Sequence, residues 1–403
     1  MRSRQIVISG GGIAGLSAAL AFSDKGLPVR LYERAAEPHE AGAGLQLSPN
    51  ATRLLGRLGV LDALSEVATR PEAIVLRNAA TLKEVARVPL GDPATARWQS
   101  PYLVLHRADL HGVLLDCARR SPTVEIVTGA SVTAAGLQPQ GVNVRIERRG
   151  MVEYAEAGLL VMADGVWSAN RAVLGAASES RFSGRIAWRA TANAEGEMAR
   201  FMGSVVEPGS VTVFLHPRAH LIAYPIRGGA SVNFAAFAKG VVSDTKWSTA
   251  ADAGPLAAAF HGAAPQLADM LGTIGGWTVW PIHTVDPQSP WIDPRGAVSI
   301  GDAAHAMTPF AAQGAAMAIE DAYVLAQHVD AQPAALGIAL QRYEKARRER
   351  VKRVAARGRL NEFVWHAAGP IALARNLFLK LRGPQRLAAD LDWLYGWQPA
   401  EVS

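Results

Sequence analysis

A glycine-rich turn near the amino terminus constrains the fold more than any other part of the chain. Gly10, Gly12 and Gly15 follow the apolar run 5–9 and precede an Ala- and Leu-rich segment over 13–25 and a second apolar run. This order predicts a buried strand, a tight turn, a helix and a second parallel strand. The first glycine permits the turn, the second lets the backbone approach a pyrophosphate, and the third permits close helix packing. The unit therefore predicts a doubly wound lobe that binds a dinucleotide at the helix amino terminus.

Acidic residues at three later points suit one long ligand. Glu33, 23 residues after Gly10, lies where a carboxylate accepts hydrogen bonds from a ribose hydroxyl, although this motif alone does not separate NAD from FAD. Asp164 and Asp302 each follow an apolar run, and Asp302 can accept from a sugar-alcohol hydroxyl. A simple nicotinamide dehydrogenase does not need this third segment, which therefore favours FAD. The alternative for Asp164 is a structural one, the cap of a helix that begins near Ser168.

The pattern of strands predicts a second lobe interleaved with the first. At 403 residues the chain exceeds one usual hydrophobic core. Short alternating runs, and a meander over 211–238 with turns at 217–218 and 228–229, indicate antiparallel strands. We therefore expect an α/β (α+β) two-lobe fold with three parts: a parallel-sheet FAD-binding lobe (1–72, 101–180 and 281–330), an antiparallel-sheet substrate lobe (73–100 and 181–280) and C-terminal helices (331–403).

Charge and cysteine content narrow the class further. The lone Cys117 excludes an internal disulfide and a multi-cysteine metal site, so we expect a cytoplasmic protein without a metal. Nine Lys/Arg against two Glu over 342–359 give this segment a net charge of +7, within a chain of +6. We interpret the segment as a solvated helix face, because no aromatic platform accompanies it, and expect no nucleic-acid partner. Neither the five residues before the first apolar run nor the uncharged stretch 303–319 suits a signal peptide or a membrane span.

Four motifs taken together resemble the single-component FAD aromatic hydroxylases. They are Gly-Ala-Gly-Leu-Gln-Leu-Ser-Pro-Asn-Ala at 42–51, His-Arg-Ala-Asp-Leu at 106–110, Ala-Asp-Gly-Val-Trp-Ser at 163–168 and Gly-Asp-Ala-Ala-His with a following proline at 301–309. The similarity spans nearly the whole chain, including the tail 392–397. Within the family it points to the salicylate hydroxylase, 3-hydroxybenzoate 6-hydroxylase and 6-hydroxynicotinate 3-monooxygenase branch. It implies an FAD fold of the p-hydroxybenzoate hydroxylase and glutathione reductase type.

The resemblance also implies an activity and a set of cofactor-binding residues. The activity is hydroxylation of an aromatic or heteroaromatic phenol or carboxylate through a flavin C4a-hydroperoxide, with O₂ and a transiently bound NAD(P)H as co-substrates. Homodimers are common in the family. The residues implied to hold FAD tightly but non-covalently are Gly10, Gly12, Ile13, Ala14, Gly15, Glu33 and Arg34 at its ADP half, with Gln46, Arg107, Asp164, Gly301, Asp302, Gly314, Ala315 and Ala316 along the rest.

Three residues are candidates for catalysis. His220 and Tyr224 are four apart on a predicted strand, so both face one side of the sheet and form a plausible phenol-handling pair. The alternative is a core His and Tyr satisfied by backbone partners. Pro309, by resemblance, lies near the isoalloxazine. We interpret His305 as structural or close to FAD, and not as a catalytic base.

Substrate identity is not defined by these motifs. The chain departs from the two enzyme groups that it resembles. The 6-hydroxynicotinate 3-monooxygenases carry histidines at the positions of Gln46 and Phe310. The 3-hydroxybenzoate enzymes carry glutamine at the position of Pro309. Phe310 predicts a more apolar pocket floor. Three alternatives stay open: an FAD-dependent epoxidase or N-hydroxylase of a larger apolar substrate, a plain NAD-dependent dehydrogenase, and a non-catalytic flavin- or nucleic-acid-binding module built on the basic segment 342–359.

Overall fold

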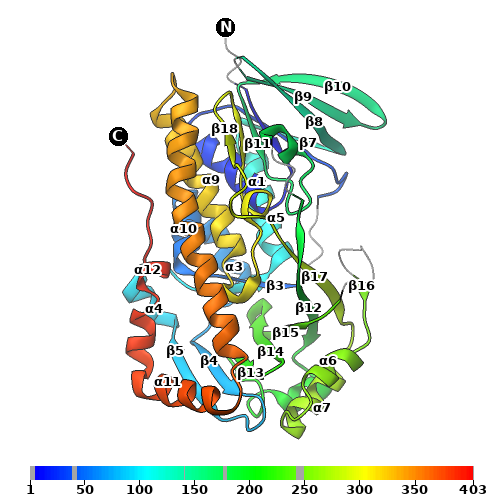
Figure 1. Cartoon of the computed structure of the whole chain (residues 1–403), viewed down its shortest axis with the longest axis vertical. Helices are drawn as coiled ribbons and strands as arrows, with labels where there is room; N and C mark the ends of the chain where they lie inside the picture. Colours follow the sequence, from blue (N-terminus) through cyan, green and yellow to red (C-terminus); the bar gives the residue numbers. More distant parts are fainter. Residues whose placement is uncertain (1–4, 39–42, 140, 176–178, 242–248, 403) are drawn as a thin grey trace.

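The computed structural model describes residues 5–38, 43–139, 141–175, 179–241 and 249–402. A six-stranded sheet and an eight-stranded sheet form the centres of two lobes. The long helix α10 (Leu336–Trp365) passes along both lobes (Figure 1). The two-lobe α/β fold predicted from the sequence is confirmed, whereas the exact domain boundaries stay a prediction.

The first lobe is built on a mainly parallel sheet in the order β18-β19-β11-β1-β2-β7. Only the pair β18–β19 is antiparallel. The strands come from distant parts of the chain: β1 (Ile6–Ser9), β2 (Val29–Glu33), β7 (Val124–Thr128), β11 (Leu159–Met162), β18 (Ile292–Asp293) and β19 (Ala297–Ser299). Both faces of this sheet are covered, which explains why its central strands β1 and β11 are almost wholly apolar.

Side chains of β1 alternate between the two covers of this sheet. Ile6 and Ile8 pack in the core with the helices α1 (Ile13–Asp24), α5 (Arg107–Arg120) and α9 (Gly314–Ala331). Val7 points the other way and packs against a three-stranded antiparallel sheet. That sheet, not predicted as a separate layer, consists of β8 (Ala130–Gln138), β9 (Gly141–Arg148) and β10 (Met151–Ala157).

The second lobe is an eight-stranded sheet in the order β16-β17-β12-β15-β14-β13-β4-β5. The predicted meander is confirmed as β13, β14 and β15, but the expectation of a wholly antiparallel lobe is wrong, because β4 and β13 pair in parallel. The strands are β4 (Ala73–Asn78), β5 (Glu84–Pro89), β12 (Arg181–Asn193), β13 (Ser210–Leu215), β14 (Ala219–Ile226), β15 (Ser231–Lys239), β16 (Thr249–Ala250) and β17 (Thr278–Thr284).

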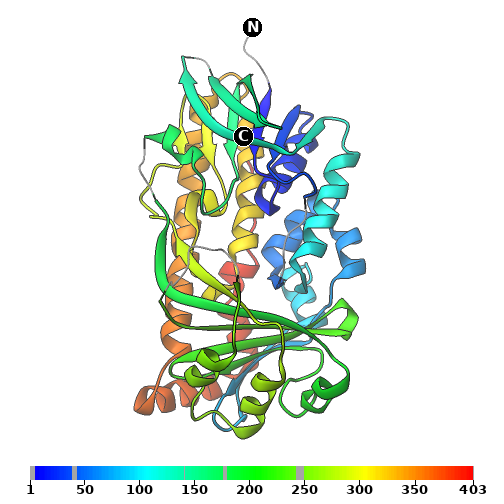
Figure 2. The same ribbon diagram turned by 90° about the vertical axis from the view of Figure 1, so that its right-hand side faces the viewer.

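The eight-stranded sheet presents one face to the first lobe and the other to helices of its own. Ile222 and Tyr224 of β14 belong to the core shared with the first lobe, whereas Leu221 and Ala223 pack in a separate core. Two helices, α6 (Gly254–Ala259) and α7 (Pro265–Thr273), and the 3₁₀ segment η2 (Gly196–Phe201) contribute to that second core. Figure 2 shows α6 and α7 below the sheet. These helices lie in a block for which the sequence predicted only strands.

The remaining elements connect or brace the lobes. The ribbon of β3 (Gly44–Leu47) and β6 (Leu103–His106) is antiparallel and lies next to β14. The helices are α2 (Pro49–Arg57), α3 (Leu61–Val67), α4 (Gly91–Trp98), α8 (Asp302–His305), α11 (Gly369–Ala389) and α12 (Asp392–Tyr395), and the short 3₁₀ segments are η1 (Asn170–Leu174), η3 (Arg227–Gly229) and η4 (Pro309–Ala311). No helix in the ranges given above is both long enough and apolar enough to cross a membrane.

The basic segment of α10 is partly buried, so its interpretation as a solvated face is wrong for two arginines. Arg347 is fully buried and binds the carboxylates of Glu320 (2.6 Å) and Asp321 (2.7 Å) on α9. Arg350 binds Glu320 at 2.9 Å. Buried ions of this kind need partners of opposite charge, and α9 supplies them. The segment therefore ties α10 to the helix that begins at Gly314.

Candidate active site

A cavity of about 540 Å³ lies between the two lobes. The three distant segments predicted to share one ligand all contribute to its wall: the glycine turn, Asp164 and its neighbours, and the stretch from Asp302 to Ala318. They are also in contact with one another, since a Cβ built on Gly10 would lie 2.6 Å from the Ala163 carbonyl oxygen. A Cβ on Gly301 would lie 3.0 Å from that of Ala14. The structure thus brings the three segments together.

The glycine turn has the geometry that its sequence predicts. Gly10 has a φ of +102°, and a Cβ on Gly15 would lie 1.9 Å from the Gly10 carbonyl oxygen, so neither position accepts a larger residue without movement. Helix α1 begins beyond Gly12 without a side-chain cap. Uncapped backbone N–H groups at a helix amino terminus are suited to bind phosphate oxygens.

Glu33 lines the same part of the cavity and is held by the backbone. One carboxylate oxygen accepts from the Gly11 N–H and the other from the Ala35 N–H, both at 2.7 Å. Each oxygen keeps a further lone pair that can accept from a sugar hydroxyl. Arg34, next along the chain, lines the cavity as well.

Asp164 does not cap a regular helix, so that alternative is wrong. The helical segment that follows is η1, a 3₁₀ turn with Ala169 at its N-cap position, and Oδ2 of Asp164 accepts instead from the Asn170 side chain at 2.8 Å. Burial raises the pKa of the Asp164 carboxyl, while hydrogen bonds from Ser168 and Asn170 oppose that rise. Asp164 is therefore a positioned carboxyl group in the cavity wall.

Arg107, Asp302 and Gln46 line the middle of the cavity. Burial lowers the pKa of Arg107, and the attraction of Asp302 acts against this, which indicates that the two charges lie near each other. The Tyr102 hydroxyl donates to Oε1 of Gln46 at 2.6 Å, so the amide nitrogen of Gln46 stays available to a ligand. Gly42, the first residue of the motif at 42–51, lies outside the described residues.

The third segment, which begins at Gly301, is anchored by Asp321 of helix α9. Oδ2 of Asp321 accepts from the Gly301 N–H at 2.9 Å and contacts Nε2 of His305 at 2.6 Å. His305 is buried and contacts Asp321, which agrees with its interpretation as a structural residue. Pro309, Gly314 and Ala315 line the cavity, whereas Gly15, Gly301 and Ala316 pack behind its wall.

Tyr224 stands at the end of the cavity formed by the eight-stranded sheet. Ile222, Phe237 and Trp280 surround it with apolar surface. Burial raises the pKa of the Tyr224 hydroxyl, and the nearby Arg189 only partly offsets this, so the phenol stays protonated at neutral pH. A Cβ on Gly44 would lie 2.6 Å from that hydroxyl, and glycine is therefore needed there.

His220 faces the same side of β14 as Tyr224 but is not among the residues that line the cavity. Its ring is fully buried, stacks on Phe237 at 4.9 Å, and contacts the edge of Phe310. Nδ1 of His220 lies 3.0 Å from Nε2 of His366. Burial, together with His366, lowers the pKa of His220 well below its usual value, so the ring is neutral. Phe310 likewise packs against His220 and does not line the cavity, so the apolar floor predicted from Phe310 is supplied by Phe237.

Arg189 is the functional candidate that the sequence reasoning missed. It lies on β12 between the buried residues Trp188 and Ala190, and its side chain lines the cavity beside Trp280. Burial and the neighbouring charge of Arg107 lower its pKa to about 10, so the guanidinium is still charged at neutral pH. β12 carries three arginines, Arg181, Arg185 and Arg189, so no signal in the sequence distinguished Arg189 from the other two.

Known proteins are similar to this chain in sequence and in architecture. A family model described as an FAD binding domain matches residues 3–358. A 3-amino-4-hydroxybenzoate 2-monooxygenase of Streptomyces platensis is 36% identical over 400 residues, covering 99% of this chain and 97% of the relative. A 3-hydroxybenzoate 6-hydroxylase of Aquipseudomonas alcaligenes is 31% identical over 397 residues, covering 98% of each.

The solved structures agree with this fold. A salicylate hydroxylase in complex with its substrate superposes with a TM-score of 0.81 at 23% identity, covering 98% of this chain and 95% of that one. The chain therefore belongs to the FAD-binding aromatic monooxygenases, the family that its four motifs predicted.

Proposed function

We propose that this protein hydroxylates a single-ring aromatic carboxylic acid that also carries a phenol, with O₂ and NAD(P)H as co-substrates. The observation that carries the proposal is the pairing of Tyr224 with the charged Arg189 at the apolar end of the cavity. Arg189 is half-buried and forms no ion pair with a carboxylate among the described residues, so it suits an anionic group on the ligand. The same cation disfavours the alternative of a wholly apolar substrate for epoxidation or N-hydroxylation.

The residues present fit FAD. A Cβ at Gly10 or Gly15 would strike neighbouring backbone, so the tight turn depends on these glycines, and the uncapped start of α1 suits a pyrophosphate. Glu33 and Arg34 would hold the adenosine half, and Arg107, Asp164 and Asp302 the central part of the cofactor. Bound FAD supplies the electron transfer and oxygen activation that hydroxylation requires.

The chain's own residues would bind and orient the aromatic acid. Arg189 would form a charge-assisted pair with its carboxylate, and the protonated Tyr224 would donate a hydrogen bond to its phenol oxygen. Ile222, Phe237 and Pro309 would exclude water from the reacting ring. We assign His220 a supporting position, in which it holds Phe237 in place from behind the cavity wall.

NAD(P)H is proposed to bind transiently. The described residues form one largely parallel sheet, and FAD would occupy the phosphate-binding turn of that sheet. The nicotinamide cofactor would therefore approach from the solvent side without a Rossmann unit of its own. The lone Cys117 supports a reducing, cytoplasmic setting for this chemistry.

A direct experiment tests the function. Purified protein reconstituted with FAD should be yellow and should consume NADH or NADPH faster when 3-hydroxybenzoate, salicylate or an aminohydroxybenzoate is added. Mass spectrometry with ¹⁸O₂ should show one oxygen atom in the product. A protein that cannot retain FAD, or that gives only hydrogen peroxide with every aromatic acid, contradicts the proposal.

Tyr224→Phe is expected to leave FAD binding intact and to slow hydroxylation about five- to ten-fold, since one hydrogen bond to the ring oxygen contributes about 1–1.5 kcal/mol. Looser positioning should also raise the share of NAD(P)H that ends as hydrogen peroxide. Product formed per NAD(P)H consumed measures this, with Tyr154→Phe on the exposed strand β10 as the control. An unchanged product ratio in Tyr224→Phe would remove this tyrosine from the mechanism.

We also propose a homodimer that uses helix α11. Three leucines recur every four residues on that helix: Leu373, Leu377 and Leu381. Their side chains are 72%, 59% and 73% exposed, so they form an apolar stripe that faces water in the monomer. A second copy of the chain would bury it. Light scattering should give twice the chain mass for the wild type and the monomer mass for Leu377→Glu, with Lys380→Glu as the control; a monomeric wild type contradicts the dimer.

A further inference from the structure

A smaller cavity lies beside the main one and shares two side chains with it. Its volume is about 250 Å³, and both Arg189 and Trp280 line it as well as the main cavity. Since a cavity of about 150 Å³ can hold a benzene ring, this space suffices for a single-ring compound with small substituents. Its other lining residues are Ala43, His106, Ala190, Thr191, Arg227, Gly276 and Thr278.

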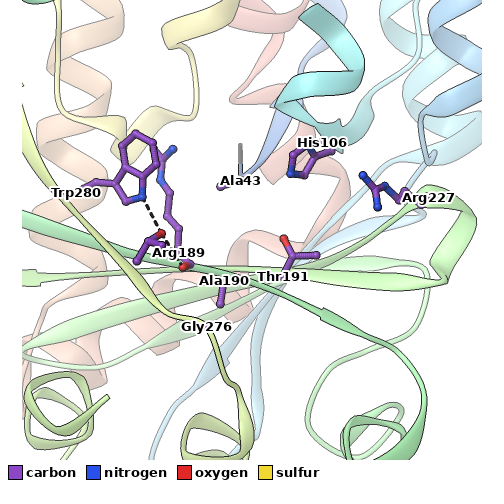
Figure 3. Close-up of a pocket in the computed structure, with 9 residues that line it drawn as sticks. Ala43, His106, Arg189, Ala190, Thr191, Arg227, Gly276 and Trp280 are labelled. Atoms are coloured by element: carbon purple, nitrogen blue, oxygen red, sulfur yellow. Dashed lines mark hydrogen bonds between the residues drawn. The ribbon is translucent and has the colours of Figure 1, made fainter. Parts of the chain in front are cut away.

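The side cavity is basic. Figure 3 shows Arg189 and Trp280 on one side of it and His106 and Arg227 on the other. Among its described lining residues none is acidic. Arg227 has an exposed side chain, and the nearest carboxylate, that of Asp109, lies at the 4.0 Å limit of an ion pair. Such a weak exposed pair leaves the arginine free to attract an anion, and a basic recess raises the local concentration of anions.

Arg189 separates the side cavity from the main one. Its guanidinium lies over the Trp280 ring at 5.1 Å and forms no ion pair with a carboxylate in the described part of the chain. Trp280 is fixed, because its indole N–H donates to the Thr278 hydroxyl at 2.9 Å and that hydroxyl donates to the Arg189 carbonyl oxygen at 3.1 Å. The flexible arginine side chain is therefore the part of this partition that can serve either cavity.

A second opening would serve the substrate once the cofactor is bound. The glycine turn and Gly314 both line the main cavity, so FAD held between them would share that cavity with the substrate on its way to Tyr224. The side cavity reaches the same end of the main cavity through the partition of Arg189 and Trp280.

We propose that the side cavity is the port through which the aromatic acid enters, with Arg227 attracting its carboxylate at the rim and Arg189 receiving it inside. The inference rests on the proposed function, because it takes an aromatic acid as the substrate. It adds a route and a binding step that precede the reaction.

Stopped-flow binding to the FAD-loaded enzyme tests the port, with 3-hydroxybenzoate as the charged probe and 3-hydroxybenzyl alcohol as the neutral one. Arg227→Gln should lower the association rate of the acid about five-fold at low salt, reduce its salt dependence, and leave the alcohol unaffected. Thr191→Trp should narrow the port and slow association and dissociation of both probes about ten-fold, with equilibrium dissociation constants unchanged. Arg218→Gln, at the opposite end of β14, is the charge-matched control.

The outcomes separate the port from the function. Wild-type association rates in both Arg227→Gln and Thr191→Trp, in proteins that retain FAD and hydroxylate the acid, overturn the port and leave the proposed function standing. A Thr191→Trp protein with weakened equilibrium binding but a normal association rate also overturns it. Failure of the wild-type holoenzyme to bind or hydroxylate any aromatic acid instead defeats the proposed function.

Discussion

Replacing Arg189 with methionine is expected to lower kcat/KM for an aromatic carboxylate by about 10- to 100-fold. A charge-assisted hydrogen bond contributes about 1.5–3 kcal/mol, and each 1.4 kcal/mol is a factor of ten. The uncharged methionine keeps most of the contact with Trp280 but offers the carboxylate no donor. FAD content and flavin absorbance should stay at the wild-type level, because the glycine turn and the carboxylates are untouched.

The test of this role depends on comparing substrates that differ only in charge. Arg189→Met should discriminate against 3-hydroxybenzoate but not against 3-hydroxybenzamide, measured as product formed per unit of enzyme. Arg181→Met, on the same strand but exposed to solvent, removes the same charge outside the cavity and should behave as the wild type. An equal loss for the acid and the amide would mean that Arg189 supports the sheet and does not recognise the carboxylate.

Arg347→Met should lower the free energy of unfolding of the whole protein by about 3–5 kcal/mol. This is a large part of the usual free energy of unfolding of folded proteins, about 5–15 kcal/mol. Although burial lowers the pKa of Arg347, Glu320 and Asp321 raise it, so the residue is charged. Removing this cation leaves two buried carboxylates with fewer partners. The effect should reach the cavity as well, since Asp321 also holds Gly301 and His305.

Urea unfolding followed by circular dichroism measures this loss, and FAD retention on a desalting column measures its effect on the site. Lys345→Met is the matched control, because Lys345 lies on the same helix with an exposed side chain. Its unfolding midpoint should equal that of the wild type. If Arg347→Met unfolds at the same urea concentration as Lys345→Met, the buried ion network does not support the lobe.

Much of the first lobe could be predicted because its signals are local. The glycine turn, its strand and its helix occupy one continuous stretch, and Gly10 and Gly15 each have a specific geometric reason to be there. Asp164 and Asp302 were identified because each follows a buried strand, and parallel strands end at one edge of a sheet. The spacing of His220 and Tyr224 likewise predicted their common face correctly, since side chains alternate along a strand.

The details that decide the chemistry depend on contacts between distant residues. The spacing on β14 could not reveal that Phe237 of β15 and Phe310 of η4 cover His220. The composition of the basic segment could not reveal that Arg347 pairs with acids 26 and 27 residues earlier. The short α6 and α7 and the parallel pairing of β4 with β13 also depend on packing across the lobe.

The sequence by itself determined the family, the cofactor site and the two-lobe plan, because these follow from turn chemistry, strand periodicity and motifs that retain their meaning without neighbours. Only the tertiary structure decided which side chains face the substrate. Arg189 is one arginine among many in the sequence, and it becomes a candidate anion receptor because the fold places it in the cavity wall with Tyr224 and Trp280, where no carboxylate of the described residues pairs with it. Burial and missing partners are properties of the assembled core, and no local pattern encodes them.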